Sequence, residues 1–202
     1  MSIYVIDNFY DTKNLNNVIQ KSNECKWTFG RADLIDDMYW TAQVYGHLYD
    51  TETNYDNFEL KEVEKLWDEF SNKFKIPKEK LDSCYLNGIT YGVEAYPHVD
   101  VDKANCWTSV ITYVTGEWNS HWGGETSFFD KHFVKDPSND IFYQHDIIKS
   151  VLPKYNRIVL FDSNTTHAVR TISKSFKGIR KTLMFKIKDM PVKQLMENYK
   201  CN

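Results

Sequence analysis

Two histidines and one aspartate stand where they could share a metal ion. His98 and Asp100 are separated by one residue, and His167 follows far downstream. Two imidazoles and one carboxylate form the donor set that holds non-haem Fe(II) on one face of an octahedral ion and leaves the opposite face for a co-substrate and O₂. The pattern favours an iron oxygenase, although a His-x-Asp tripeptide alone is weak evidence because a lone buried histidine is usually a core residue.

These residues need a frame in which two sheets face each other. Side chains alternate along a strand, so His98 and Asp100 are expected to point into a barrel while Val99 points away, with His167 arriving from the facing sheet. Short β-rich runs separated by turn residues predict eight strands and hence a mainly β fold, a double-stranded β-helix or jelly roll. The runs are Cys84–Tyr91, Glu94–Val101, Thr108–Thr115, Thr126–Asp130, Asp146–Leu152, Arg157–Asp162, His167–Ile172 and Lys181–Lys188.

A cation stands at the start of the last predicted strand. Alternation places Arg180 and Thr182 inside the barrel and the apolar side chains between and beyond them on the outer face. A buried guanidinium needs an anion, so a dicarboxylate that chelates the metal at one end could be held by Arg180 at the other. Tyr113 faces the same side and could donate its phenol to that carboxylate. The alternatives are a strand-end arginine paired with a surface acid and an ordinary core tyrosine.

Helices precede the strands. Asp11 can cap an amphipathic helix that runs to about Glu24, and a stronger apolar stripe predicts a second helix from about Phe58 to Phe74, both covering the major sheet. The acidic, aromatic stretch 31–56 is expected to be a substrate-facing loop or a solvated flap. We expect a single domain with a helical N-terminal region (1–82), a jelly-roll core (83–188) and a short C-terminal helix (191–200).

Composition narrows the class of protein. The 25 basic and 28 acidic side chains give no cationic field for nucleic acid, and the sequence shows neither the residue pattern of a signal peptide in its first residues nor a long apolar run. We therefore expect no nucleic-acid or membrane partner, and a cytoplasmic protein, or one of the host cytoplasm if it is viral. The cysteines lack metal-ligand spacing and are expected to be free thiols: Cys25, Cys84, Cys106 and Cys201.

Three segments together resemble a known family. They are HVDVDKANCWTSVITYVTGEWNSHWGGETSFF, LPKYNRIVLFDSNTTHAV and GIRKTLMFKI, within residues 83–188. This part of the chain resembles the Fe(II)/2-oxoglutarate-dependent dioxygenases and, within them, the prolyl 4-hydroxylase-like branch. The resemblance implies Fe(II), 2-oxoglutarate and O₂, with ascorbate as a further candidate. It also implies His98, Asp100 and His167 as iron ligands, Arg180 as the anchor of the distal 2-oxoglutarate carboxylate, and Tyr113 as its partner, with Tyr91 and Thr182 as further co-substrate contacts.

Two positions leave alternatives open. Lys177 could replace Arg180 as the anchor if the register of the last strand is displaced, and we prefer Arg180 because it directly adjoins the β-run. Asp102 shares a strand face with Asp100, but only Asp100 has the His-x-Asp spacing. An aspartate ligand fills a site that halogenating relatives leave for chloride, so the resemblance implies a hydroxylase.

The substrate is less well defined by the sequence. The resemblance favours a peptidyl proline, with release of succinate and CO₂, and a free amino acid, sugar or other small metabolite is the alternative. A non-catalytic metal-binding module and a nucleic-acid demethylase are less favoured. Aromatic side chains at the expected cavity mouth could hold a proline ring or could be packing residues: Tyr39, Trp40, Trp122, Phe142 and Tyr143. Of the remaining histidines, His47, His132 and His145 are expected on the surface, and His121 beside the mouth.

Overall fold

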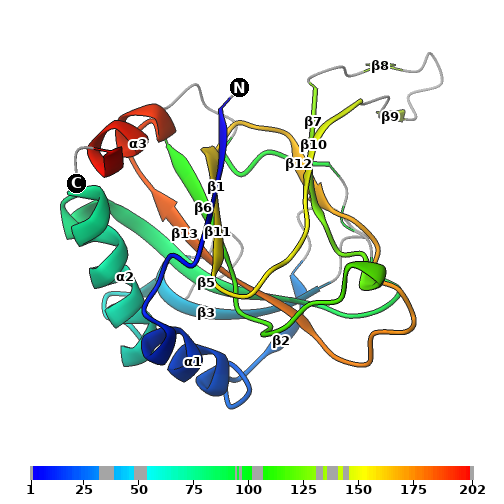
Figure 1. The fold of residues 1–202 in the computed structure, drawn as a ribbon, viewed down its shortest axis with the longest axis horizontal. Helices are drawn as coiled ribbons and strands as arrows, with labels where there is room; N and C mark the ends of the chain where they lie inside the picture. Colours follow the sequence, from blue (N-terminus) through cyan, green and yellow to red (C-terminus); the bar gives the residue numbers. More distant parts are fainter. Residues whose placement is uncertain are drawn as a thin grey trace.

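The structure, a computed structural model, describes residues 2–31, 39–47, 54–93, 95, 97–101, 107–130, 134–135, 141–142 and 146–200. Its strands form two antiparallel sheets that face each other (Figure 1). The major sheet contains β1 (Ile3–Asp7), β2 (Thr28–Arg31), β3 (Tyr39–His47), β4 (Asn54–Tyr55), β5 (Leu81–Ile89), β6 (Thr108–Tyr113), β11 (Arg157–Asp162) and β13 (Arg180–Ile187). The minor sheet contains β7 (Thr126–Phe129), β10 (Ile147–Val151) and β12 (His167–Val169).

The order of strands is that of a double-stranded β-helix. The major sheet runs β1-β11-β6-β13-β5-β3-β2, with β4 paired to β3, and the minor sheet runs β10-β7-β12. The short strands β8 (Val134–Lys135) and β9 (Ile141–Phe142) pair only with each other. Seven of the eight predicted runs form strands, so the predicted fold class is confirmed.

The second predicted strand, Glu94–Val101, is wrong as a continuous strand. Within its described residues only His98 pairs, through an isolated antiparallel bridge to His167. Pro97 has no N–H with which to extend a ladder, and the N–H of Asp100 donates to the Ser163 carbonyl at 2.9 Å, in the turn before β12. His98 thus lies beside β12 at the edge of the minor sheet, where a fourth strand would be.

The N-terminal region also differs from its predicted helical character. β1 pairs with β11, and β3 pairs with β5 along most of its length. Part of the stretch 31–56, predicted as a loop or flap, is therefore a strand of the major sheet. Two of its aromatic rings pack within the fold: Tyr45 stacks on Phe58 with centroids 4.7 Å apart, and Trp40 lies 4.9 Å from Phe29. Residues 32–38 and 48–53 lie outside the described part of the chain.

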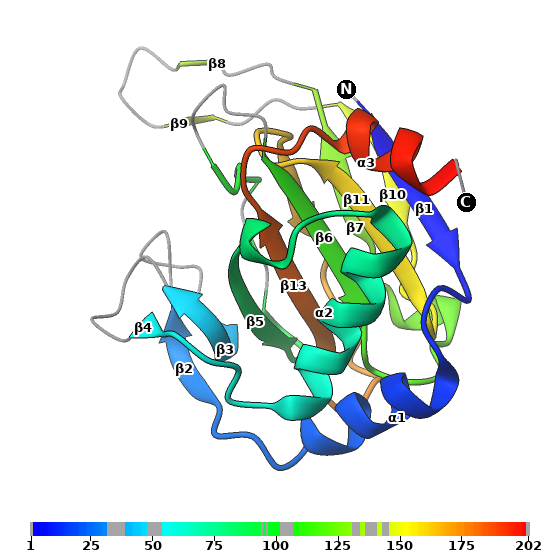
Figure 2. The same cartoon turned by 90° about the vertical axis from the view of Figure 1, so that its left-hand side faces the viewer.

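Three helices complete the described fold. α1 (Thr12–Lys21) begins after Asp11, whose carboxylate accepts from the Asn14 N–H at 3.0 Å, as the sequence predicted. α2 (Lys61–Phe74) begins three residues later than predicted, and α3 (Val192–Lys200) follows Pro191. Figure 2 shows α1 and α2 lying across one face of the major sheet, with α3 near β1 and β11.

Each face of the major sheet has a core of its own. The outer core joins the helices to Leu183, Phe185 and Ile187 of β13. The inner core, between the sheets, contains Met184 of β13 together with aromatic and aliphatic residues of β5, β6, β7, β10 and β11. Strand alternation thus assigns odd positions of β13 to the helices and even positions to the space between the sheets.

The predictions of free thiols and of no membrane-spanning segment can be compared with the structure only at the described residues. Cys25 and Cys84 are free thiols, whereas Cys106 and Cys201 lie outside the described residues. Among the described helices, each is too short or too polar to cross a bilayer.

Candidate active site

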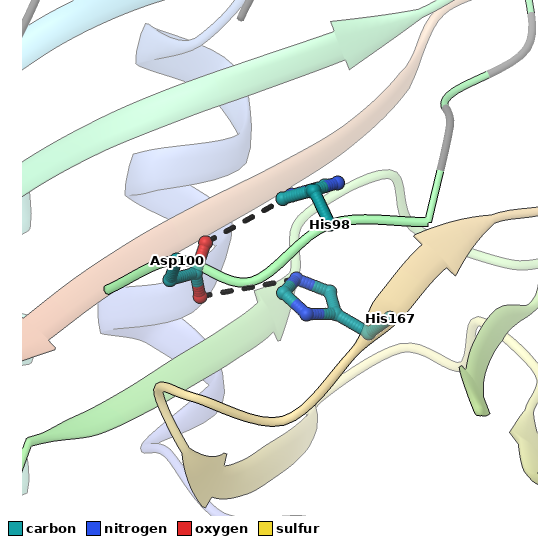
Figure 3. A group of neighbouring side chains, drawn as sticks. All are labelled: His98, Asp100 and His167. Atoms are coloured by element: carbon teal, nitrogen blue, oxygen red, sulfur yellow. Dashed lines mark ion pairs between the residues drawn. The ribbon is translucent and has the colours of Figure 1, made fainter. Parts of the chain in front are cut away.

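His98, Asp100 and His167 converge between the two sheets. Their potential ligand atoms all lie within 4.8 Å of one another. His98 Nε2 lies 3.9 Å from Asp100 Oδ1, and His167 Nε2 lies 3.8 Å from Asp100 Oδ2 (Figure 3). Each imidazole faces one oxygen of the carboxylate, so the three side chains bring their donor atoms close together, as a shared metal ion requires.

Backbone hydrogen bonds fix the two histidines relative to each other. The N–H of His98 donates to the His167 carbonyl at 3.0 Å, and the N–H of His167 donates to the His98 carbonyl at 2.9 Å. This antiparallel bridge brings the rings to a centroid distance of 4.6 Å. A single bridge therefore does the positioning that was predicted for a full strand.

His167 is held as a neutral imidazole. Burial lowers its pKa to about 4 despite the nearby negative charge of Asp100, so the ring is uncharged near neutral pH. Nδ1 lies 2.9 Å from the Thr165 carbonyl, and a proton on Nδ1 leaves the lone pair on Nε2, which faces Asp100. The Phe161 ring packs against the imidazole at 4.7 Å and restricts its orientation.

Asp100 is a buried carboxylate with several polar partners. The hydroxyl of Ser109 on β6 donates to its Oδ2 at 2.5 Å and also bonds to the Ser163 hydroxyl at 2.8 Å. The ammonium group of Lys186 on β13 forms an ion pair with the same oxygen. Burial alone would raise the pKa of Asp100, but the charges of Lys186 and the two histidines hold it below its ordinary value. The carboxylate is therefore ionised near neutral pH.

Arg180 lies at the other end of the inner face of β13, buried to 3 % exposure. Its Nε donates to the Gly124 carbonyl at 2.8 Å and one terminal nitrogen donates to the Thr126 hydroxyl at 3.1 Å. Burial lowers its pKa, while the nearby Tyr113 and the negative charge of Glu125 oppose that shift. Among the described residues, no carboxylate forms an ion pair with this guanidinium. A buried cation that has no ion pair with a described carboxylate suits an anionic ligand.

Tyr113 and Thr182 lie near Arg180. The guanidinium carbon is 5.2 Å from the centre of the Tyr113 ring, and the Tyr113 hydroxyl bonds to Thr126 at 2.9 Å and to the Val151 carbonyl at 3.2 Å. Burial raises the pKa of this phenol, so it is protonated near neutral pH. Thr182 is buried on the same face of β13 and is paired with Tyr113 across the sheet.

The other predicted positions are placed differently. Tyr91 is 58 % exposed on the turn after β5, and no described contact links it to Arg180 or Tyr113. Lys177, the alternative anchor, is exposed, whereas Arg180 is buried. His121 is exposed on a short 3-10 turn, Ser120–Trp122. Asp102, His132, His145 and Tyr143 lie outside the described residues, and the side chains of His47 and Phe142 are not described.

Trp122, one of the predicted mouth aromatics, packs in a cluster with two aromatic rings that were not among them. Trp122 lies 5.3 Å from Trp118 and 4.8 Å from Phe176, and Trp118 lies 4.7 Å from Phe176. This cluster ties the loop before β7 to the loop before β13. Trp118 also closely approaches Gly124, whose carbonyl binds Arg180. The cluster thus borders the arginine end of the cavity.

Sequence reasoning missed Lys186, Ser109 and Thr126. A signal for Lys186 was available, because positions 180, 182, 184 and 186 share one face of a buried strand, and a lysine there must find an anion. Ser109 and Thr126 gave no such signal, since threonine and serine are common in strands of any kind.

The donor set fits a non-haem Fe(II) ion. Two imidazole nitrogens and one carboxylate oxygen are available, and one imidazole is neutral and buried. The buried cation Arg180 lies on the inner face of β13, the strand whose Lys186 contacts Asp100. The chemistry that these residues can support is a metal shared between the protein and an anionic co-substrate.

Several solved structures are similar in fold to this chain. A prolyl hydroxylase from Trichoplax adhaerens, in complex with a peptide fragment of the hypoxia inducible factor oxygen degradation domain, is 14% identical with a TM-score of 0.65, over 99% of this chain and 86% of that chain. A prolyl-4-hydroxylase from Pseudomonas putida is 11% identical with a TM-score of 0.62, over 92% of each chain. HygX from Streptomyces hygroscopicus, with nickel, 2-oxoglutarate and hygromycin B bound, is 10% identical with a TM-score of 0.55, over 94% and 83%. These likenesses show the fold.

The family is shown by sequence. No curated protein sequence matches the chain significantly. The family model described as the 2OG-Fe(II) oxygenase superfamily matches residues 83–185, which is just over half of the chain and contains His98, Asp100, His167 and Arg180. The chain therefore belongs to the 2OG-Fe(II) oxygenase superfamily and is a dioxygenase that uses Fe(II), 2-oxoglutarate and O₂.

Proposed function

We propose that this dioxygenase hydroxylates a proline residue of a peptide or protein and converts 2-oxoglutarate to succinate and CO₂. Likeness in fold to two prolyl hydroxylases, one of them bound to a peptide, supports the substrate class. The observation that carries the co-substrate assignment is Arg180, a buried cation that forms no ion pair with a described acid, on the inner face of the strand that also bears Lys186 beside Asp100.

The residues have distinct roles in this proposal. His98, Asp100 and His167 hold Fe(II), which together with 2-oxoglutarate and O₂ supplies the oxidant for C–H hydroxylation. The protein itself needs no general acid or base for that chemistry, and it contributes orientation and a dry cavity. His167 contributes a lone pair without first losing a proton, because it is neutral near neutral pH.

Arg180 binds the distal carboxylate of 2-oxoglutarate. A guanidinium has five N–H donors, and the hydrogen bonds to Gly124 and Thr126 leave others for a ligand. Those two bonds also fix the plane of the group, which lets it hold a carboxylate in one orientation. Tyr113 and Thr182 offer hydroxyls on the same inner face, and Tyr91 would join them only after its exposed ring turned inward.

A second candidate substrate is a small molecule, such as a free amino acid or a sugar. It is favoured by the likeness in fold to HygX, which was solved with the small molecule hygromycin B bound. The two candidate functions differ in the substrate that the enzyme oxidises. The roles proposed for the metal-binding and co-substrate-binding residues are the same in both. A nucleic-acid demethylase is less supported, since the net charge of the chain is -3.

The test has two parts. First, Fe(II) and 2-oxoglutarate binding are measured anaerobically by equilibrium dialysis. A protein that binds neither of them would overturn the assignment of the metal and co-substrate sites. Second, peptide and metabolite pools are incubated under air with Fe(II) and 2-oxoglutarate, with and without ascorbate. Mass spectrometry then follows the gain of one oxygen atom. Oxygen gained on peptidyl proline supports the proposal, and oxygen gained only on small metabolites replaces it with the second candidate.

A further inference from the structure

Lys186 is a buried lysine in direct contact with a proposed metal ligand. It lies on the inner face of β13, two residues beyond Met184 of the inner core, and its side chain is 4 % exposed. Its ammonium group forms the ion pair with Asp100 Oδ2 and also donates to the Ser109 hydroxyl at 3.2 Å. Buried lysines are rare unless paired, so this contact defines the position of the side chain.

The two oxygens of Asp100 have different surroundings. Oδ2 is bound by Lys186 and by the Ser109 hydroxyl, whereas Oδ1 is the oxygen that faces His98 Nε2. The lone pairs of Oδ2 are thus largely used by the protein. Oδ1 is left as the oxygen best able to bind a cation held jointly with the histidines.

A cation beside a ligand carboxylate has two opposite effects. A buried, uncompensated carboxylate is strongly destabilising, so Lys186 stabilises the fold when no metal is bound. When a divalent ion binds, however, the same ammonium repels it across a short distance in a cavity of low dielectric constant. Lys186 therefore favours the metal-free protein over the metal-bound protein.

We propose that Lys186 is a resident counter-cation for Asp100 that keeps the metal-free site assembled and weakens divalent-metal binding, so that the bound metal remains exchangeable. This inference rests on the proposed metal site formed by His98, Asp100 and His167. It makes Lys186 a positioning residue with an electrostatic cost to metal affinity. Removal of a purely structural lysine would lower the affinity of the site for the metal. Removal of a counter-cation raises that affinity.

The chain offers a matched control on the same strand. Lys181 is also buried on β13, but it points to the opposite side, where its ammonium group donates to Ser22 and to Asn23, each at 2.6 Å. Substitution of Lys181 also removes one buried positive charge from β13. It leaves the charge beside Asp100 unchanged. Lys181→Met should therefore destabilise the metal-free and metal-bound proteins equally.

The experiment uses Co(II) alone, under argon and without 2-oxoglutarate, with binding followed by calorimetry and thermal unfolding. For Lys186→Met we expect a dissociation constant for Co(II) lower by about tenfold or more, a lower metal-free Tm, and a larger rise in Tm on adding Co(II). Lys186→Arg, which keeps the charge, and Lys181→Met should bind Co(II) like the wild type.

The outcomes separate the inference from the function on which it rests. Unchanged or weaker Co(II) binding by Lys186→Met, beside a wild type that binds normally, overturns the counter-cation role. A wild type that does not bind Co(II), or a His167→Ala variant that binds it equally well, overturns the proposed metal site itself. If Lys186→Met folds only when Co(II) is present, the result supports the inference, because the metal then replaces the charge that Lys186 provides to the metal-free protein. If it does not fold at all, Lys186→Gln is measured against the same criteria.

Discussion

The site combines a neutral imidazole, an ionised carboxylate and buried cations, and their charges depend on burial and on one another. His167 is uncharged near neutral pH because burial lowers its pKa to about 4, and Asp100 is charged because the Lys186 ammonium group holds its pKa low against the effect of burial. Arg180 has hydrogen bonds to Gly124 and Thr126 but no ion pair with a described acid. The protein therefore presents a donor set for a divalent metal and, on the same inner face, a cation for an anion.

At the scale of single residues, Arg180→Met should specifically weaken 2-oxoglutarate binding. Loss of the buried cation leaves the distal carboxylate without its charged donor, so we expect the KM for 2-oxoglutarate to rise by about tenfold to a hundredfold. Succinate formation at increasing 2-oxoglutarate concentration measures the change. Lys177→Met, which removes an exposed cation, is the matched control. A raised KM in the Lys177 variant but not in the Arg180 variant would transfer the anchor to Lys177.

Single elements position these residues by close approach. Gly124 has a φ of +72°, and a Cβ there would come within 3.1 Å of Arg180 Cδ and of the Trp118 ring. Its carbonyl also accepts the Arg180 Nε–H. The turn before β7 thus sets the position of the guanidinium.

Gly124→Ala should therefore raise the KM for 2-oxoglutarate several-fold, in addition to a loss of stability from the left-handed backbone of about 1 kcal/mol. Gly116→Ala is the matched control, since Gly116 has a φ of +87° and a Cβ added there would meet nothing within 4 Å. Both variants carry the backbone strain, but only one displaces Arg180. Equal KM values for the two variants, measured from succinate formation, would exclude this positioning role.

The edge strand β1 is attached to β11 by an ion-pair cluster. Asp7 accepts from Arg157 at 2.7 and 3.1 Å and from Lys154 at 2.7 Å. The hydrogen bond from Arg157 is the main cause that lowers the pKa of Asp7 from 3.8 to about 2, with Lys154 adding to the shift against partial burial. A folded-state pKa below the unfolded value contributes stability above that unfolded value, and this contribution is lost as pH falls toward the folded value.

Asp7→Asn should accordingly lower the free energy of unfolding near neutral pH by about 1 kcal/mol, a modest figure because the cluster is partly exposed to solvent. As pH falls from about 4 to about 2, the wild type should lose this advantage and the two unfolding free energies should converge. Urea unfolding at a series of pH values measures both. A constant difference between the proteins down to the lowest pH would contradict the assignment to Asp7.

At the scale of the whole molecule, the two faces of the major sheet differ in what they contact. Its outer face packs on the helices through an aromatic core, and its inner face packs on the minor sheet and bears Arg180 and Lys186. Phe70 of α2 is fully buried and packs on Phe74 at 4.5 Å, on Trp67 at 5.7 Å and on Phe185 at 5.9 Å. Damage to this layer should reduce stability without altering the ligand cavity directly.

Phe70→Ala should lower the free energy of unfolding by about 3–5 kcal/mol, because it removes a large buried ring and leaves a cavity. The KM for 2-oxoglutarate should remain within about twofold of the wild-type value at temperatures where the variant is folded. Denaturant unfolding and steady-state kinetics test the two parts separately. A large change in KM with little loss of stability would show that the two faces of the sheet are coupled.

The sequence predicted the parts of this molecule that depend on local periodicity. Alternating runs predicted the jelly-roll strands, Asp11 predicted the start of α1, and the apolar stripe predicted most of α2. The shared face of positions 180 and 182 also placed Arg180 inside. Features that depend on distant pairing could not be predicted in this way. β3 has ordinary acidic and aromatic neighbours in the sequence, and its pairing with β5 becomes evident only in three dimensions.

The site shows the same division. The spacing of His98 and Asp100 suggested convergence with His167, but the bridge that achieves it is a single residue pair and leaves no periodic pattern. Lys186 stood on a predictable face, yet its partner Asp100 comes from a segment that is not a regular strand. Charge partners across two sheets are set by the tertiary fold, so neither propensity nor alternation specifies them.

The most direct test of the central assignment is Fe(II)-dependent conversion of 2-oxoglutarate to succinate under air, measured in parallel for the wild type, His167→Ala and Lys177→Met with a pool of proline-containing peptides. We predict succinate formation that requires added Fe(II), is lost in His167→Ala, and is retained in Lys177→Met. Equal succinate formation by the wild type and His167→Ala, or none by a folded wild type supplied with Fe(II), would contradict the account.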